Sequence, residues 1–112
     1  MITLRDLEHL EGQYQLALAN ADKIERVGFY PKYPKEVNDF MQALSAPPWM
    51  ISYRPEAVAD IMKNIETANI DEIREVLTGS SRAERFCDGA WEQVMETRML
   101  DPVFERLRQI LA

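Results

Sequence analysis

Apolar side chains recur along this sequence at the spacing i, i+3, i+4, i+7, which is the period of an amphipathic helix. Two complete copies of the pattern follow a proline, and the first turn of a helix tolerates proline because its missing N–H needs no partner there. The pattern therefore predicts helices over 34–45 and over 55–67. The apolar residues of the two copies are Val37, Phe40, Met41 and Leu44, and Val58, Ile61, Met62 and Ile65.

Capping residues predict two more helices in the second half of the chain. Asn69 followed three residues later by Glu72 is typical of a helix start, and Gly79 is a plausible end for that helix. Ser81 with Glu84 has the S-x-x-E spacing of a capping box and precedes a long segment with a wide apolar face. We expect this segment to form the central helix of the bundle.

The two ends of the chain are also predicted to be helical. Asp101 followed by Pro102 forms a cap and first turn, and the apolar residues after it predict a terminal helix. Thr3 and Asp6 occupy capping positions at the amino end. Gly12 weakens the helix that follows by about 1 kcal/mol relative to alanine, so this segment forms either one helix or two.

Prolines and aromatic residues separate these helices. Two stretches, 28–33 and 45–54, are rich in them and are predicted to be loops. The segment 49–53 could be extended, but no second strand pattern offers it a partner. The fold class is therefore predicted to be all-α, a compact bundle of five to six short helices. With 112 residues, we expect one domain over 1–112.

The charge balance of the chain limits the classes of partner that it is expected to bind. The chain carries a formal net charge of −6, which disfavours the phosphate-neutralising surface of a nucleic-acid-binding protein. Its only basic stretch is 23–35, which has four basic residues and one acidic residue. No apolar run exceeds four residues, so we expect no contact with a membrane and a cytoplasmic protein.

The types of residue present limit the kinds of metal, cofactor or catalytic site that the chain can form. One cysteine and one histidine leave no set of side chains typical of a zinc site, and the common nucleotide and hydrolase motifs do not occur, so we expect no metal and no cofactor. Cys87 is predicted to be a small buried hydrophobe. The acidic residues Glu84, Asp88 and Glu92 recur at four-residue intervals and are more simply a solvated helix face than a catalytic group. Enzymatic activity is left open, with the balance against it.

Two stretches stand out as candidate binding segments. In the first, Tyr30, Lys32 and Tyr33 alternate with prolines. This stretch could form an aromatic ledge that stacks a base or holds an extended acidic peptide. Alternatively, Phe29 and Tyr30 cover the core beneath a stiff loop, and this structural interpretation is favoured because buried aromatic residues dominate core energetics.

The second stretch runs from Arg82 to Trp91. Helical spacing would place Arg82, Arg85 and Gly89 in one stripe with Asp88 close by, while Phe86 points into the core. Arg85 could then clamp a carboxylate or a phosphate at the margin. A structural arginine that ties down a neighbouring loop is at least as well supported. A glycine inside a helix suggests close backbone approach.

These two stretches resemble the motifs of a family of small uncharacterised bacterial proteins. The likeness comprises Y-P-x-Y-x-x-E-V-x-x-F from Tyr30 and R-x-E-R-F-x-D-G from Arg82, and it extends over about residues 28–111. The resemblance implies a compact, mostly helical domain. It supplies no established activity, substrate or cofactor.

The leading hypothesis for function is a non-enzymatic module that binds a protein or peptide partner. Its predicted binding residues are Tyr30, Lys32, Tyr33, Arg82, Arg85, Asp88 and Gly89. The alternative is a small-molecule-binding protein or a weakly recognisable enzyme with a polar site centred on Arg85. An acidic mimic of DNA ranks last because the charges are too mixed, and a homodimer is possible.

Overall fold

The computed structural model describes all residues 1–112 as six α-helices, three short 3₁₀ helices and one β-hairpin. The α-helices are α1 (Leu4–Ala19), α2 (Lys35–Leu44), α3 (Pro55–Lys63), α4 (Ile70–Arg82), α5 (Ala90–Thr97) and α6 (Asp101–Leu111). The 3₁₀ helices are η1 (Ala21–Lys23), η2 (Ile65–Thr67) and η3 (Ala83–Arg85), and the strands are β1 (Glu25–Val27) and β2 (Tyr30–Lys32). The prediction of a mostly α-helical, compact fold is confirmed.

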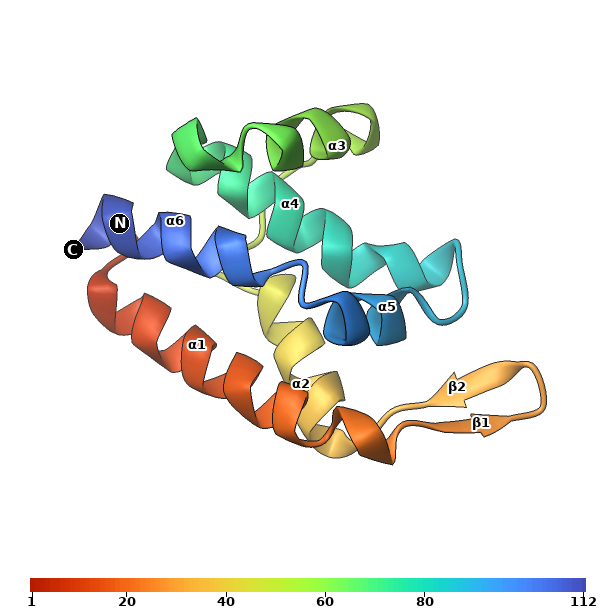
Figure 1. The fold of residues 1–112 in the computed structure, drawn as a ribbon. Helices are drawn as coiled ribbons and strands as arrows, with labels where there is room; N and C mark the ends of the chain where they lie inside the picture. The colour runs from red at the N-terminus through yellow and green to blue at the C-terminus, as the bar shows by residue number, and fades with distance from the viewer.

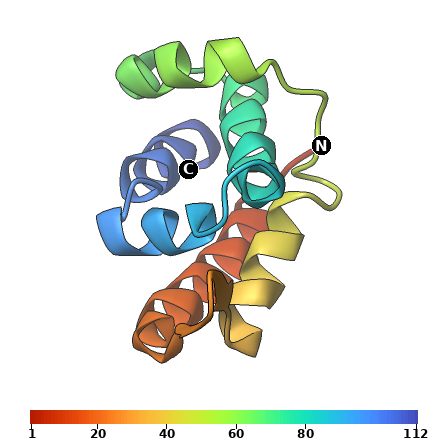
Figure 2. The ribbon, with the colours of Figure 1, turned by 90° about the vertical axis from the view of Figure 1, so that its right-hand side faces the viewer.

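The helices surround one apolar core. Figure 1 shows α1 and α2 at the bottom, α6 above α1, and α4 between α6 and α3. Helix α5 and the hairpin lie at the end of the molecule opposite to the two chain termini. Turned by 90°, the ribbon shows the hairpin nearest the viewer and α5 beside the carboxyl end of α4 (Figure 2).

Three aromatic rings form the centre of the core where α1, α2 and α6 meet. Tyr14 stacks on Phe104 with 4.8 Å between the ring centroids and lies 5.2 Å from Phe40. All three side chains are almost completely buried. The Tyr14 hydroxyl donates a hydrogen bond of 2.6 Å to Asp101 Oδ1, which satisfies a polar group that burial would otherwise leave without a partner.

Capping chemistry fixes two of the helix starts that the sequence indicates, whereas α6 begins at Asp101 with Leu100, and not Asp101, as its N-cap. Thr3 and Asp6 form a complete capping box at α1, and Asn69 and Glu72 form another at α4. The amino-terminal segment is a single helix that continues through Gly12. The expected 34–45 helix is α2, with Pro34 as its N-cap. The expected 55–67 helix is divided, because α3 ends at Lys63 and η2 follows it.

The expected central helix from Ser81 is wrong. Ser81 belongs to the last turn of α4, and its hydroxyl donates a 2.6 Å hydrogen bond to the Met41 carbonyl instead of capping a new helix. The chain leaves the α-helix after Arg82, and α5 begins only at Ala90. Gly79 does not end α4 either. It lies inside the helix, where a Cβ would come within 3.2 Å of the Tyr53 ring.

The predicted loop over 28–33 is also wrong in part, because Tyr30–Lys32 pairs with Glu25–Val27 as an antiparallel hairpin. The two turn residues are Gly28 and Phe29, and Gly28 has φ +67°, which glycine adopts readily at the first position of a tight hairpin turn. Strand residues are almost all exposed, so they carry no apolar alternation that sequence reasoning could detect.

The 45–54 segment lacks regular secondary structure, as predicted. It is nevertheless anchored to α4 at two points. The Ile51 amide donates to Thr78 Oγ1, and Arg54 donates to Glu75 through its backbone amide, Nε and Nη2 at 2.9–3.1 Å. These contacts fix the segment on α4 as it enters α3.

None of the helices combines the length and the apolar composition that a bilayer-spanning helix requires.

Candidate binding groove

An open groove with a volume of about 890 Å³ lies at the hairpin end of the molecule. One wall is formed by the 53–58 segment and the carboxyl half of α4, and the other by residues 86–96. We call this feature the α4–α5 groove. Its lining residues are Arg26, Tyr53, Pro55, Val58, Gly79, Ser80, Ala83, Phe86, Cys87, Asp88, Gly89, Ala90, Glu92, Gln93, Val94, Glu96 and Met99.

Glu84 builds the wall formed by residues 86–89. Its Oε2 accepts a 2.8 Å hydrogen bond from the Gly89 amide, and its Oε1 accepts a 2.9 Å bond from the Trp91 amide. These amides are among the first of α5, whose N–H groups have no partner within the helix. A carboxylate is the favoured cap at this position because it also opposes the positive end of the helix dipole.

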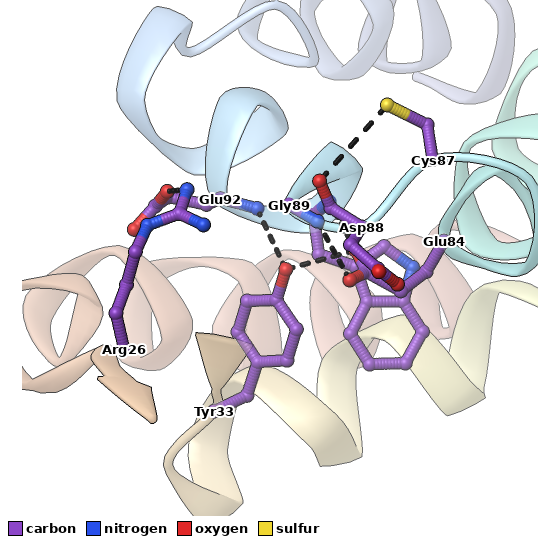
Figure 3. Close-up of polar contacts among 8 residues, drawn as sticks. Arg26, Tyr33, Glu84, Cys87, Asp88, Gly89 and Glu92 are labelled. Atoms are coloured by element: carbon purple, nitrogen blue, oxygen red, sulfur yellow. Dashed lines mark hydrogen bonds and ion pairs between the residues drawn. The ribbon is translucent and has the colours of Figure 1, made fainter. Parts of the chain in front are cut away.

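Tyr33 joins this cap to the segment that follows the hairpin. Its hydroxyl donates a 2.8 Å hydrogen bond to Glu84 Oε1 and accepts one of 3.3 Å from the Glu92 amide. Figure 3 shows the ring pointing toward the start of α5. Burial, and then the hydrogen bond to Glu84, raise the pKa of the Tyr33 hydroxyl well above its ordinary value, so it remains a donor at neutral pH.

Trp91 continues the same set of contacts into the bundle. Its ring lies 5.2 Å from that of Tyr33, and its Nε1 donates a 2.8 Å hydrogen bond to the Ser81 carbonyl at the end of α4. Tyr33, Glu84 and Trp91, together with the amides they engage, form what we call the cap network. The network fixes the start of α5 against both α4 and the chain leaving the hairpin.

Arg26 of β1 connects the hairpin directly to α5. Its Nη2 lies 2.5 Å from Glu92 Oε1. Gly89 lies beside this pair and has φ +92°, and a Cβ at this position would approach Arg26 Nη2 to 3.3 Å. The close approach suggested for Gly89 is therefore present, but at a left-handed turn before α5 and not inside a helix.

Large apolar side chains are exposed around this end of the molecule. Phe29 at the tip of the hairpin is 90% exposed, Tyr30 is 66% exposed, and Phe86 at the groove is 82% exposed. Val27 on β1 is also exposed. The interpretation of Phe29 and Tyr30 as a cover for the core is wrong, and so is the assignment of Phe86 to the core, because each belongs to a segment that projects from the bundle.

The structure separates the seven residues predicted as a binding site. Asp88 and Gly89 line the groove, and Tyr33 supports it through the cap network. Tyr30 and Lys32 are exposed on β2, where Lys32 is paired in register with Glu25. Arg82 does not line the groove, and its Nη2 lies 3.7 Å from Met50 Sδ.

Arg85 does not form the anion clamp considered from the sequence. It is exposed at the end of η3, does not line the groove and makes no ion pair. The helical stripe of Arg82, Arg85 and Gly89 does not exist, because the α-helix is interrupted between them. Cys87 is exposed, contrary to its predicted burial, since the same interruption turns it outward.

The contacts of Glu84 and Tyr33 do not support a role for either residue as the acid or base of an Arg85-centred enzyme site. Glu84 accepts three hydrogen bonds that hold the start of a helix. Removing a proton from Tyr33 would place a second negative charge beside it. No group of three or more His, Cys, Asp or Glu side chains is placed to bind a metal ion.

Sequence reasoning missed the wall of the groove formed by Tyr53, Val58 and Gly79. These residues come from two segments, and Gly79 is a misleading signal because a glycine after an apolar stripe is typical of a helix end. The packing of Tyr53 and Val58 against Gly79 explains the glycine.

Residues 19–112 match a family model described as a family of unknown function (DUF6508). No curated protein and no solved structure matches the chain. The match includes the hairpin, the cap network and both walls of the groove.

Proposed function

We propose that this chain, which belongs to the family of unknown function DUF6508, is a non-enzymatic module that binds a segment of another protein in the α4–α5 groove. The observation that carries the proposal is the 82% exposure of Phe86 in the lining of an open groove, at the same end of the molecule as the hairpin whose tip residue Phe29 is 90% exposed. Clustered exposed apolar residues mark interaction surfaces in soluble proteins. Aromatic side chains are also enriched in the cores of protein–protein interfaces.

Burying these exposed side chains against a partner would contribute enough free energy to change the affinity measurably. Burying one phenylalanine side chain contributes about 1.5–3 kcal/mol, and every 1.4 kcal/mol changes a dissociation constant by about tenfold. Phe86 and the other apolar side chains that line the two walls, among them Tyr53, Val58, Val94 and Met99, would be covered together by one partner segment. We call these other apolar side chains the groove floor. The groove thus offers a central anchor with a surrounding apolar contact.

The cap network prepares this surface before a partner arrives. Glu84 fixes both the Gly89 and the Trp91 amides, and Tyr33 ties Glu84 to the segment after the hairpin. Phe86 therefore lies on a backbone whose two ends are already held. A preorganised surface loses less conformational entropy on binding, which raises affinity without any added contact.

A quantitative affinity pull-down tests the proposal. Wild type, Phe29→Ala/Phe86→Ala and a control, Leu16→Ala, would be compared by mass spectrometry from the same lysate. Leu16 is an apolar side chain on α1 that is 59% exposed and does not line the groove. We expect a partner retained by wild type and the control and reduced at least tenfold with the double variant, and purified partner should reproduce this order.

A second double variant, Tyr30→Ala/Arg85→Ala, tests whether the partner instead contacts the exposed face of the hairpin or the Arg85 side chain, neither of which lines the groove. Retention of the partner by this variant with loss in the Phe29/Phe86 variant places the contact at the two phenylalanines. Identical protein profiles for wild type and both folded double variants would contradict the proposed function.

A further inference from the structure

The groove has a charged rim as well as an apolar floor. Its charged lining residues are Arg26, Asp88, Glu92 and Glu96. Arg26 is bound to Glu92 at 2.5 Å, so this pair is locally neutral. Asp88 and Glu96 are exposed and take part in no ion pair. The rim therefore carries two uncompensated negative charges beside apolar surface.

Two of the acidic residues are neighbours on α5. Glu96 lies four residues after Glu92, one turn nearer the carboxyl end of the helix. Arg26 pairs with Glu92 and not with Glu96, and α5 has no basic side chain in its last turn. A cation placed beside Glu96 would therefore gain an ion pair without displacing one.

The position of the unpaired carboxylates indicates a complementary partner. Lysine or arginine residues along one border of a second helix, lying beside α5, would meet the carboxylates of Asp88 and Glu96. Apolar residues on the adjacent face of that helix would reach Phe86 and the groove floor.

We infer that the occupant of the groove is an amphipathic helix of a partner protein, with lysine or arginine residues bordering its apolar face. This inference rests on the proposed function and adds the chemical class of the partner. The carboxylates of Asp88 and Glu96 would select the basic border, while Phe86 and the groove floor would supply most of the affinity.

Synthetic helices test the inference without knowledge of the natural partner. The probe is a fluorescein-labelled 18-residue peptide of leucine and lysine with one apolar face, and its counterpart replaces every lysine with glutamine. Fluorescence anisotropy measures both affinities. We expect the lysine peptide to bind wild type at least tenfold more tightly than the glutamine peptide, and its affinity to fall as the salt concentration rises.

A matched pair of variants separates the groove from the overall charge. Asp88→Lys/Glu96→Lys should weaken the lysine peptide at least tenfold. Glu66→Lys/Glu105→Lys changes the net charge by the same amount at exposed positions outside the groove and should change the affinity less than twofold. Equal weakening by both variants would overturn the inference, because binding would then follow net charge alone.

The remaining outcomes distinguish this inference from the proposed function. If both peptides bind equally and Phe86→Ala weakens both, the inference that the partner carries a basic border is overturned. The proposed binding of a partner segment in the groove is then still supported. If Phe86→Ala changes neither peptide, the inference fails, and the pull-down decides the proposed function. If sedimentation shows a dimer that Asp88→Lys/Glu96→Lys dissociates, the occupant is a second copy of the chain and the inference is overturned.

Discussion

Phe40 and Phe86 lie at two ends of the molecule that are stabilised in different ways. Phe40 is completely buried beside Tyr14 and Phe104, whereas Phe86 is 82% exposed at the groove. The first region is held by apolar burial, which does not depend on direction. The second is held by hydrogen bonds from Tyr33 and two backbone amides to Glu84. Directional contacts can hold an aromatic residue outside the core and leave it free for a partner.

The largest effect is expected in the aromatic core. Phe40→Ala should lower the free energy of unfolding by about 3–5 kcal/mol, because it removes a fully buried ring and leaves a cavity among Tyr14 and Phe104. Urea unfolding followed by circular dichroism measures the change. A loss below about 1 kcal/mol would show that the core does not depend on this packing.

The cap network should give the next largest effect. Glu84→Ala leaves the Gly89 and Trp91 amides and the Tyr33 hydroxyl without their acceptor, and we expect a loss of about 2–3 kcal/mol in the free energy of unfolding. Glu84→Gln retains one oxygen and should lose less. Hydrogen exchange at both amides should accelerate in the alanine variant, and unchanged exchange would remove Glu84 as the cap of α5.

Two glycines provide a matched test of backbone geometry. Gly89→Ala should destabilise the protein by about 1–2 kcal/mol, because φ +92° is strained for alanine and the new Cβ crowds Arg26. Gly12→Ala should stabilise it by up to about 1 kcal/mol, since Gly12 lies within α1 with no atom near its Cβ position. Thermal unfolding of both variants checks whether the two changes in stability have opposite signs. Changes of the same sign would contradict the left-handed backbone described for Gly89 or the helical one described for Gly12.

A smaller, pH-dependent effect is expected where the 45–54 segment meets α4. Hydrogen bonds from Arg54 hold the pKa of the Glu75 carboxyl below its ordinary value. Because an unfolded chain protonates glutamate near about pH 4.3, the unfolded state binds the proton first as the pH falls. The stabilisation is therefore complete above about pH 5 and is lost below about pH 4 as Glu75 is protonated.

Glu75→Gln provides the control for this pH dependence. Urea midpoints of wild type and the variant should differ at neutral pH and converge in acid. Binding to the groove should weaken in parallel, since Arg54 lies within the 53–58 segment that forms one wall. A constant difference between the two midpoints at all pH values would contradict the role of the Arg54–Glu75 pair.

Most of the helical plan could be predicted from the sequence because its signals are local. The capping boxes at Thr3 and Asn69 use side chains within one turn of the amides they bind. The apolar stripe of α2 reflects a single buried face, and the residues Val37, Phe40 and Leu44 on it are all buried. Local patterns of this kind need no knowledge of the rest of the fold.

The candidate site could not be predicted in the same way because it depends on contacts between distant residues. Ser81 has the spacing of a cap, but its hydroxyl donates to Met41, forty residues away. Glu84 caps α5 by reaching forward five and seven residues, across a turn that only Gly89 marks. The hairpin shows no alternation since neither of its faces is buried. The resemblance did identify the two segments that the Tyr33–Glu84 hydrogen bond joins.

The smallest effect on stability is expected where the effect on binding is largest. Phe86→Ala should change the free energy of unfolding by less than about 0.5 kcal/mol, because an 82% exposed ring loses almost no burial when truncated. Urea unfolding of this variant beside Phe40→Ala gives the direct comparison. If Phe86→Ala instead costs more than about 2 kcal/mol, Phe86 packs against the protein in solution and the groove is closed without a partner. A near-zero stability change combined with loss of partner binding would assign the ring to recognition alone, since a residue needed for folding cannot be removed without a stability change.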